Sequence, residues 1–143
     1  MTEGIYQHRL VISTGAIDAN GHANNVEYVR WMQEAAIAHA DAAGCSEATR
    51  AAGASWVVRS HHVEYLRPVF AGENLTVQTW VATVRKSSSL RKYRFWRDGE
   101  LVARGETMWV FIAAATGRPV GIPAAVSSAF VLVPPESEPS GCE

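Results

Sequence analysis

Cysteine is scarce in this 143-residue chain, which has two, Cys45 and Cys142, far apart and without a CxxC pair. Secreted disulfide frameworks, zinc ribbons and redox dithiols need closely spaced cysteines, so the spacing argues against all three. An excess of one charge is also lacking, since 13 lysines and arginines oppose 14 acidic residues and leave a net charge of −1. No field of one sign is therefore available to attract nucleic acid or an anionic membrane.

Long apolar runs are absent as well. The longest ends at Ala115 and is far shorter than the ~20 residues that cross a bilayer, while residues 1–10 lack the apolar stretch of a signal peptide. We therefore expect a cytoplasmic protein without a membrane segment. The composition, with 48% hydrophobic and 19% charged residues, is that of a globular chain. We predict one domain over residues 1–133, followed by a polar, mobile C-terminal tail over residues 134–143.

The hydrophobic pattern predicts one strand, one long helix and then a series of strands. Residues 5–14 suit a first strand, and apolar residues at three- and four-residue steps predict a helix over 26–44. Asn24 is the expected N-cap, with Glu27 reaching back in a variant of the capping box. Strand patterns follow over 56–68, 75–84, 89–97 and 101–114, with Asp98-Gly99 as a hairpin turn.

This element order predicts an α+β fold. A single helix followed by consecutive antiparallel strands can bury its apolar face only across the sheet. We expect an antiparallel sheet of about five strands wrapped around one long central helix. Open edge strands promote aggregation unless another copy covers them, which favours a dimer with joined sheets.

The polar segment before the helix carries the candidate chemistry. Asp18, Asn20 and His22 alternate a carboxylate, an amide and an imidazole directly before a helix N-terminus. The unpaired amides and dipole of such a terminus favour developing negative charge. Thioester hydrolysis needs a group that activates water or attacks the carbonyl, and hydrogen-bond donors for the oxygen that becomes negative. The carboxylate suits the first role and the helix amides suit the second.

Three segments resemble one known family. DANGHANNVEYVRWMQEA (18–35) resembles the active-site loop and helix start of hotdog-fold acyl-CoA thioesterases of the 4-hydroxybenzoyl-CoA thioesterase group. YLRPVFAGENLTVQTWV (65–81) and DGELVARGETMWVFIAAATGRPVGIP (98–123) resemble strands and turns of that family. The resemblance covers roughly residues 5–125. It implies a hotdog fold, an acyl-CoA substrate, no cofactor beyond the coenzyme A of the substrate, and a homodimer or homotetramer with sites between protomers.

The same resemblance implies residue roles. Asp18 matches the aspartate that acts as nucleophile or as general base on water. The Asp-x-Asn-x-His pattern is also similar to that of plant acyl-ACP thioesterases, which implies supporting catalytic roles for Asn20 and His22. Tyr28 matches an aromatic position that lines the acyl pocket, and we include Asn25 beside it as a substrate-binding candidate.

A second candidate binding segment lies between two predicted strands. It combines two cations with three hydroxyls, the groups that bind the phosphates of coenzyme A. Its residues are Arg85, Lys86, Ser87, Ser88 and Ser89. In proteins similar to this one the segment contributes to CoA binding, whereas the alternative is an ordinary solvated hairpin turn.

No metal site is predicted, and other functions stay open. His61 and His62 are neighbours in a strand, so their rings point to opposite faces and cannot chelate one ion together. Glu34 is a second candidate carboxylate, because another hotdog thioesterase group places its catalytic acid in the middle of the helix. The alternatives to hydrolysis are a non-hydrolytic domain that binds acyl-CoA or acyl-carrier thioesters, and a hydratase or dehydratase on the same fold.

Overall fold

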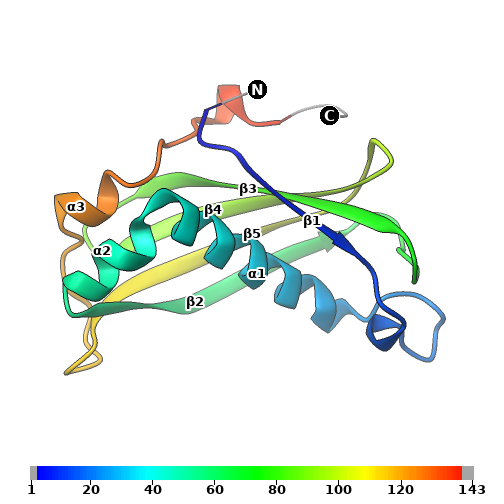
Figure 1. The fold of residues 1–143 in the computed structure, drawn as a ribbon, viewed down its shortest axis with the longest axis horizontal. Helices are drawn as coiled ribbons and strands as arrows, with labels where there is room; N and C mark the ends of the chain where they lie inside the picture. Colours follow the sequence, from blue (N-terminus) through cyan, green and yellow to red (C-terminus); the bar gives the residue numbers. More distant parts are fainter. Residues whose placement is uncertain (1–2, 140–143) are drawn as a thin grey trace.

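A computed structural model describes residues 3–139. Five strands form one antiparallel sheet in the order β1-β3-β4-β5-β2, and α1 lies along one face of it (Figure 1). The elements are β1 (Tyr6–Val11), η1 (Thr14–Ala16), α1 (Asn25–Ala43), α2 (Cys45–Ala51), β2 (Ala54–Tyr65), β3 (Asn74–Val84), β4 (Ser88–Arg97), β5 (Glu100–Ala113), α3 (Ala124–Ser127) and η2 (Pro135–Ser137). This arrangement confirms the predicted α+β hotdog fold.

Both ends of α1 are set by local sequence, although the capping box is only half formed. The Asn24 Oδ1 accepts a hydrogen bond from the Val26 amide at 2.9 Å, as expected of an N-cap. Glu27 does not reach back, because it pairs with Arg30 at 3.2 Å, and the Asn24 amide donates to Ala16 instead. At the other end Gly44 adopts a left-handed conformation with φ 83° that ends the helix.

The core lies between α1 and the sheet. Tyr28, Trp31 and Met32 of α1 are buried against apolar residues of β3, β4 and β5. Gly105 of β5 packs closely against α1, because a Cβ added there would lie 3.0 Å from the Met32 Sδ. A larger residue at this position would push α1 away from the sheet.

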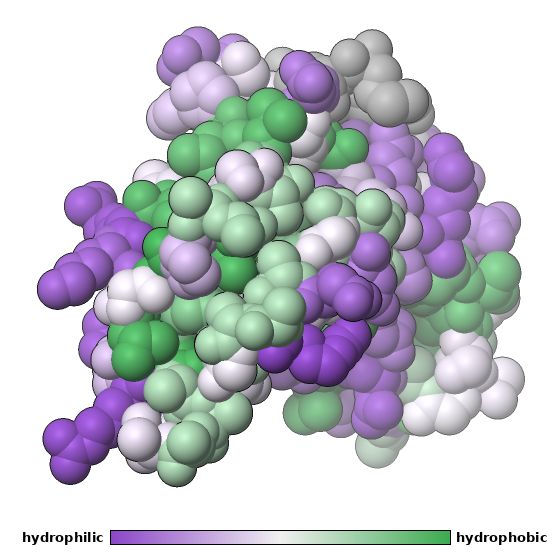
Figure 2. Space-filling view, turned by 60° about the vertical axis from the view of Figure 1, so that its left-hand side comes forward, coloured by the Kyte–Doolittle hydropathy of each residue, from purple (hydrophilic) through white to green (hydrophobic). Residues whose placement is uncertain are grey.

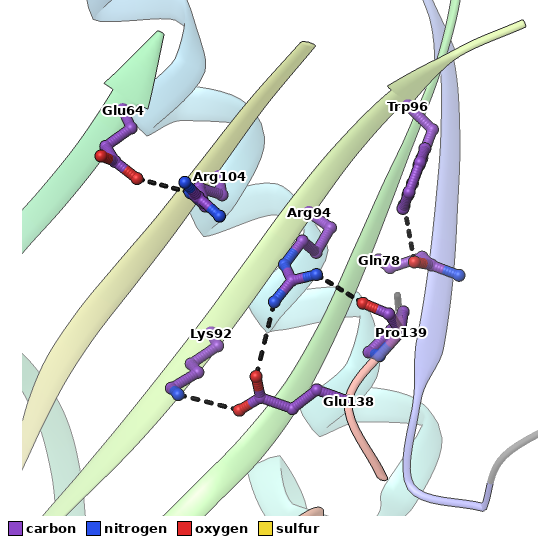
Figure 3. A network of polar contacts seen from close by, with 8 residues as sticks. All are labelled: Glu64, Gln78, Lys92, Arg94, Trp96, Arg104, Glu138 and Pro139. Atoms are coloured by element: carbon purple, nitrogen blue, oxygen red, sulfur yellow. Dashed lines mark hydrogen bonds and ion pairs between the residues drawn. The ribbon is translucent and has the colours of Figure 1, made fainter. Parts of the chain in front are cut away.

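The C-terminal segment crosses from the helix face of the sheet to the opposite face. Phe130 contacts the ring of His39 on α1 at 4.7 Å between centroids, and the Val133 amide extends the β3 edge by donating to Val81 at 3.0 Å. On the far face, Glu138 forms a 2.8 Å ion pair with Lys92 (Figure 3). Glu138 thus joins residues 134–139 to the sheet. The mobility predicted for residues 134–143 stays a prediction, and residues 140–143, with Cys142, lie outside the described part.

The two edge strands of the sheet differ in length. β2 has 12 residues and pairs only with β5 among the described residues, so its outer edge carries unpaired backbone groups. β1, at the other edge, has only six residues. Within residues 3–139, none of the helices has the length and apolar character needed to cross a membrane.

Candidate active site

The loop before α1 is held by its own backbone. The Gly21 amide donates to the Asp18 carbonyl at 3.0 Å, and the Asp18 amide donates to the His22 carbonyl at 3.1 Å. Gly21 has φ 85°, a conformation that glycine adopts without strain. The Ala23 amide donates to Val69 at 2.9 Å, which ties the loop to the chain that follows β2. The position of Asp18 is thus fixed by the fold.

The carboxylate of Asp18 is only partly engaged. Its Oδ1 accepts the Asn20 amide at 2.9 Å in a tight turn. Its Oδ2 has no hydrogen-bond partner within residues 3–139, and the side chain is half-buried. One oxygen therefore orients the carboxylate while the other is available to a water molecule or a substrate.

His22 and Asn20 lie in the same turn but are not hydrogen-bonded to the Asp18 carboxylate through their side chains. The Nδ1–H of His22 donates to the Ala23 carbonyl at 3.3 Å, which leaves the Nε2 lone pair free to accept a proton or a hydrogen bond. Asn20 is exposed and contributes its backbone amide to the turn. Their catalytic roles stay predictions, and a role for His22 would act on water or substrate rather than through contact with Asp18.

One amide at the start of α1 remains available. The Val26 amide is capped by Asn24, and the Glu27 amide donates to the Asn24 carbonyl at 2.9 Å. The Asn25 amide has no acceptor among the described residues, although the Asn25 carbonyl accepts the Tyr65 hydroxyl at 3.5 Å. The helix N-terminus therefore offers the Asn25 N–H to an oxygen that gains negative charge.

Tyr28 is part of an aromatic cluster beside the loop. Its ring packs edge-on against Trp31, Tyr65 and Phe95, and only 2% of its surface is exposed. Burial and, next, the Tyr65 phenol raise the pKa of Tyr28 to about 12, so its hydroxyl keeps its proton near neutral pH. This environment suits a packing role rather than an acid or base, and the predicted role of Tyr28 in lining an acyl pocket stays a prediction.

The segment after β3 divides into an exposed and a buried part. Arg85 and Lys86 are exposed, and a 2.8 Å hydrogen bond from the Arg85 amide to the Ser88 carbonyl closes the turn. Ser87 lies half-buried between them and β4. Ser89 differs from our expectation, because it is only 7% exposed and its hydroxyl donates to the Thr83 carbonyl at 3.0 Å. The two cations are therefore the accessible groups.

Other candidates from the sequence do not join this site. Glu34 is exposed on α1 and lies 3.8 Å from His8 of β1. His61 bonds Thr107 at 2.9 Å, and His62 is exposed. Residues 3–139 contain no group of three or more His, Cys, Asp or Glu side chains arranged to hold a metal ion.

Sequence reasoning missed a cavity between α1, α2 and the sheet, with Arg91 of β4 in its wall. Arg91 is buried and bonds His39 of α1, whereas Arg94 and Arg97 are only partly buried and pair with Glu138 and Glu73. Arg97 follows a register irregularity between Phe95 and Trp96, so the alternation does not extend to it. The alternation along β4 is the signal that places Arg91 inward, beside Tyr93 and Phe95 at steps of two.

Comparison with known proteins identifies a family and a curated relative. A family model described as "Thioesterase-like superfamily" matches residues 12–130. A curated protein of Agrobacterium fabrum, L-carnitine dehydrogenase/betainyl-CoA thioesterase, is 32% identical over 124 residues, which are 86% of this chain. The chain spans only 26% of the length of that relative.

Two solved structures have the same fold at low sequence identity. One is a 4-hydroxybenzoyl-CoA thioesterase variant in complex with 4-hydroxybenzoyl-CoA, with a TM-score of 0.82, 18% identity, and coverage of 90% of this chain and 99% of that one. The other is a Staphylococcus aureus protein in complex with CoA, with a TM-score of 0.81, 19% identity, and coverage of 90% and 83%.

Proposed function

Because this chain belongs to the Thioesterase-like superfamily, we propose that it hydrolyses acyl-CoA thioesters to a carboxylic acid and coenzyme A. The observation that carries the proposal is the loop before α1. There one oxygen of the Asp18 carboxylate has no hydrogen-bond partner within residues 3–139, and the Asn25 amide, at the N-terminus of the helix that follows the loop, has no acceptor there either.

The Asp18 carboxylate and the Asn25 amide have different roles in the proposed reaction. In the general-base route, Asp18 removes a proton from water while the water oxygen bonds to the thioester carbon. The Asn25 N–H and the dipole of α1 stabilise the negative carbonyl oxygen, the C–S bond breaks, and the proton passes to the departing thiolate. In the nucleophilic route, an Asp18 oxygen bonds to the carbon, the C–S bond breaks, and the released thiolate takes a proton from water. A second water molecule then hydrolyses the mixed anhydride, which releases the carboxylic acid and restores the Asp18 carboxylate.

Substrate binding extends the site beyond the loop. Arg85 and Lys86 are exposed cations suited to the phosphates of coenzyme A, and Tyr28 with its aromatic neighbours forms an apolar wall near Asn25. The names of the curated relative and of one structural neighbour include CoA thioesters, and a second neighbour is in complex with CoA. That chemistry supports an acyl-CoA substrate for this chain.

Assembly is part of the proposal. The long β2 strand leaves one edge unpaired among the described residues, and a second copy that pairs there would cover it and extend the sheet. We expect a homodimer, or a homotetramer built from such dimers. The Cys45 thiol is buried and has no disulfide partner among residues 3–139, which is in keeping with a reducing compartment such as the cytoplasm.

The test is thiol release from a panel of short, long-chain and aromatic acyl-CoAs. Asp18→Asn keeps an oxygen that can accept the Asn20 amide but removes the negative charge, and we expect turnover to fall about 10²- to 10⁴-fold. Asp41→Asn is the matched control, because Asp41 is an exposed carboxylate on α1. Full activity in Asp18→Asn would refute the assigned role.

The same panel separates the alternatives. Binding of acyl-CoAs without thiol release by the wild-type protein would indicate the non-hydrolytic binding domain. Gain or loss of a double bond in the acyl group, with the thioester intact, would indicate a hydratase or dehydratase.

A further inference from the structure

A cavity of about 290 Å³ opens between the second half of α1, α2 and the sheet. Its walls are mostly apolar, from Ala36, Ile37, Ala40, Trp56, Trp109 and Phe130. Apolar residues also gather on the surface at the end of the molecule that carries α2 and α3 (Figure 2). The volume is at the small end of the ~300–1,000 Å³ range of ligand pockets, so a small apolar molecule fits this space.

A cation lies in this apolar wall. Arg91 of β4 lines the cavity, although only 4% of its surface is exposed. Its Nη1 donates to the Thr79 Oγ1 at 2.9 Å and to the His39 Nδ1 at 3.0 Å. Its guanidinium carbon lies 5.1 Å from the centre of the Phe130 ring. Arg91 is thus held in one orientation from three sides.

None of these contacts neutralises the charge. Threonine and phenylalanine are uncharged, and burial together with Arg91 lowers the pKa of His39 to about 4, so this imidazole is neutral near pH 7. Within residues 3–139, no carboxylate forms an ion pair with Arg91, whereas Arg94 and Arg97 are each paired with a glutamate. The Nε and Nη2 hydrogens of Arg91 also lack acceptors in the described part of the chain.

An arginine in such a setting favours an anion. Guanidinium stays charged in proteins, and a buried charge without a counter-ion is costly. Its planar fork matches a carboxylate, which can accept two parallel N–H bonds. We propose that this cavity binds a small apolar carboxylic acid, with the carboxylate on the free N–H groups of Arg91 and the hydrocarbon body against the walls from α1, Trp56 and Trp109.

The carboxylate has two possible sources. It is either a free acid, or the distal carboxylate of an acyl group whose thioester end lies elsewhere. Ala36 follows Asn25 by eleven residues on α1, which corresponds to roughly 17 Å along the helix at ~1.5 Å per residue. The cavity therefore lies several turns from the loop that carries Asp18. Binding of a free acid there does not depend on the proposed hydrolysis.

Calorimetry with the full chain tests the site directly. Octanoate and benzoate are compared with octanamide and benzamide, which have nearly the same shape without the charge. We expect the wild-type protein to bind at least one acid tenfold or more tightly than its amide. Equal binding of acid and amide, or no binding of any of the four, would overturn the proposal.

Three variants locate the binding. Arg91→Gln removes the charge and is expected to abolish the preference for the acid. Ala40→Phe fills the cavity without altering Arg91, and is expected to abolish binding of both ligands. Arg50→Gln is the matched control, an exposed arginine on α2 that should bind like wild type. A preserved acid preference in Arg91→Gln, or unchanged binding in Ala40→Phe, would contradict the assignment. If Arg91→Gln does not fold, the comparison of acid with amide in the wild-type protein and the loss of binding in Ala40→Phe still test the proposed site.

Thiol release then distinguishes the two sources. Hexadecanedioyl-CoA carries a distal carboxylate on a chain long enough to reach from the loop to the cavity, and palmitoyl-CoA has the same chain length without it. A tenfold or greater loss of kcat/KM in Arg91→Gln for hexadecanedioyl-CoA alone would identify the acyl group as the ligand. Binding of free octanoate with no selective effect on hexadecanedioyl-CoA would identify a site for the free acid. If the chain hydrolyses neither ester, the proposed function fails while the calorimetric result stands by itself.

Discussion

The Arg91 Nη1 lies 3.0 Å from the His39 Nδ1 and joins the centre of β4 to the last turns of α1. The hydrogen bond requires a neutral imidazole with its proton on Nε2, because a guanidinium can only donate. The ring of His39 is also stacked on Tyr6 at 5.2 Å between centroids. Helix, sheet and N-terminal strand therefore meet at a histidine that must stay uncharged.

Stability should accordingly fall in mild acid. The pKa of His39 is lowered to about 4 in the folded chain, from about 6.5 when unfolded, by burial first and by Arg91 next. Between these values the unfolded state binds more protons, so stability is full above pH 6.5 and decreases as the pH falls toward 4. The loss is at most about 3 kcal/mol, at ~1.4 kcal/mol per pH unit.

Chemical denaturation at several pH values measures this slope. His39→Asn keeps an acceptor near the Nδ1 position but does not titrate, so its stability should change less between pH 6.5 and 4 than that of wild type. His62→Asn is the control, since His62 is exposed on β2. Identical slopes in wild type and His39→Asn would remove His39 as the cause.

The exposed cations after β3 should govern the affinity for coenzyme A esters. Exposed charge contacts contribute up to about 1 kcal/mol each, so Arg85→Ala combined with Lys86→Ala should raise KM about five- to tenfold and leave kcat unchanged. The effect should shrink at high salt. Arg50→Ala serves as the control, and an unchanged KM in the double variant would favour an ordinary solvated turn.

Gly105 should tolerate no larger side chain. A Cβ at this position would lie 3.0 Å from the Met32 Sδ and 3.2 Å from the His62 carbonyl. Gly105→Val should therefore cost about 1–3 kcal/mol and lower Tm by roughly 2–4 °C per kcal/mol. At Gly121 the nearest atom to an added Cβ is 4.0 Å away, so Gly121→Ala should melt within a degree or so of wild type. Similar Tm values for both variants would show that α1 can move away from β5.

The anchored C-terminal segment should contribute to stability through Glu138. Its carboxylate is 13% exposed and pairs with Lys92 and Arg94, and Arg94 also donates to the Pro139 carbonyl (Figure 3). We expect Glu138→Gln to cost about 1 kcal/mol, since partly buried pairs exceed exposed ones. Glu64→Gln, in an exposed pair with Arg104, should cost less. A larger effect at Glu64 would mean that the segment is not held by its charges.

The free edge of β2 should be the dimer interface. We expect light scattering to give a mass at least twice the 15.5 kDa of one chain. Val57 is 41% exposed on this strand, and Val57→Lys places a charge there, which disfavours edge pairing. The variant should shift toward the mass of one chain. A dimer that survives unchanged would place the interface on another surface.

Several features of this protein were determined by the sequence itself. The N-cap at Asn24 and the stop at Gly44 follow from side-chain chemistry within a few residues. Asp98-Gly99 forms the predicted tight turn, with positive φ at both residues. The alternation of apolar and polar residues marked several strands, because this alternation also depends only on neighbouring residues. The family-like loop with Asp18, Asn20 and His22 could likewise be found by reading neighbouring residues.

Other features could be seen only in the tertiary structure, because they depend on contacts between residues far apart in the chain. Glu27 pairs with Arg30 instead of completing the capping box, and Glu138 near the C-terminus pairs with two cations of β4. Strand order left the outer edge of β2 unpaired among residues 3–139. The surroundings of Arg91 come from α1, β3 and the chain after α3, so no local pattern could show that this buried cation has no counter-ion in the described part of the chain.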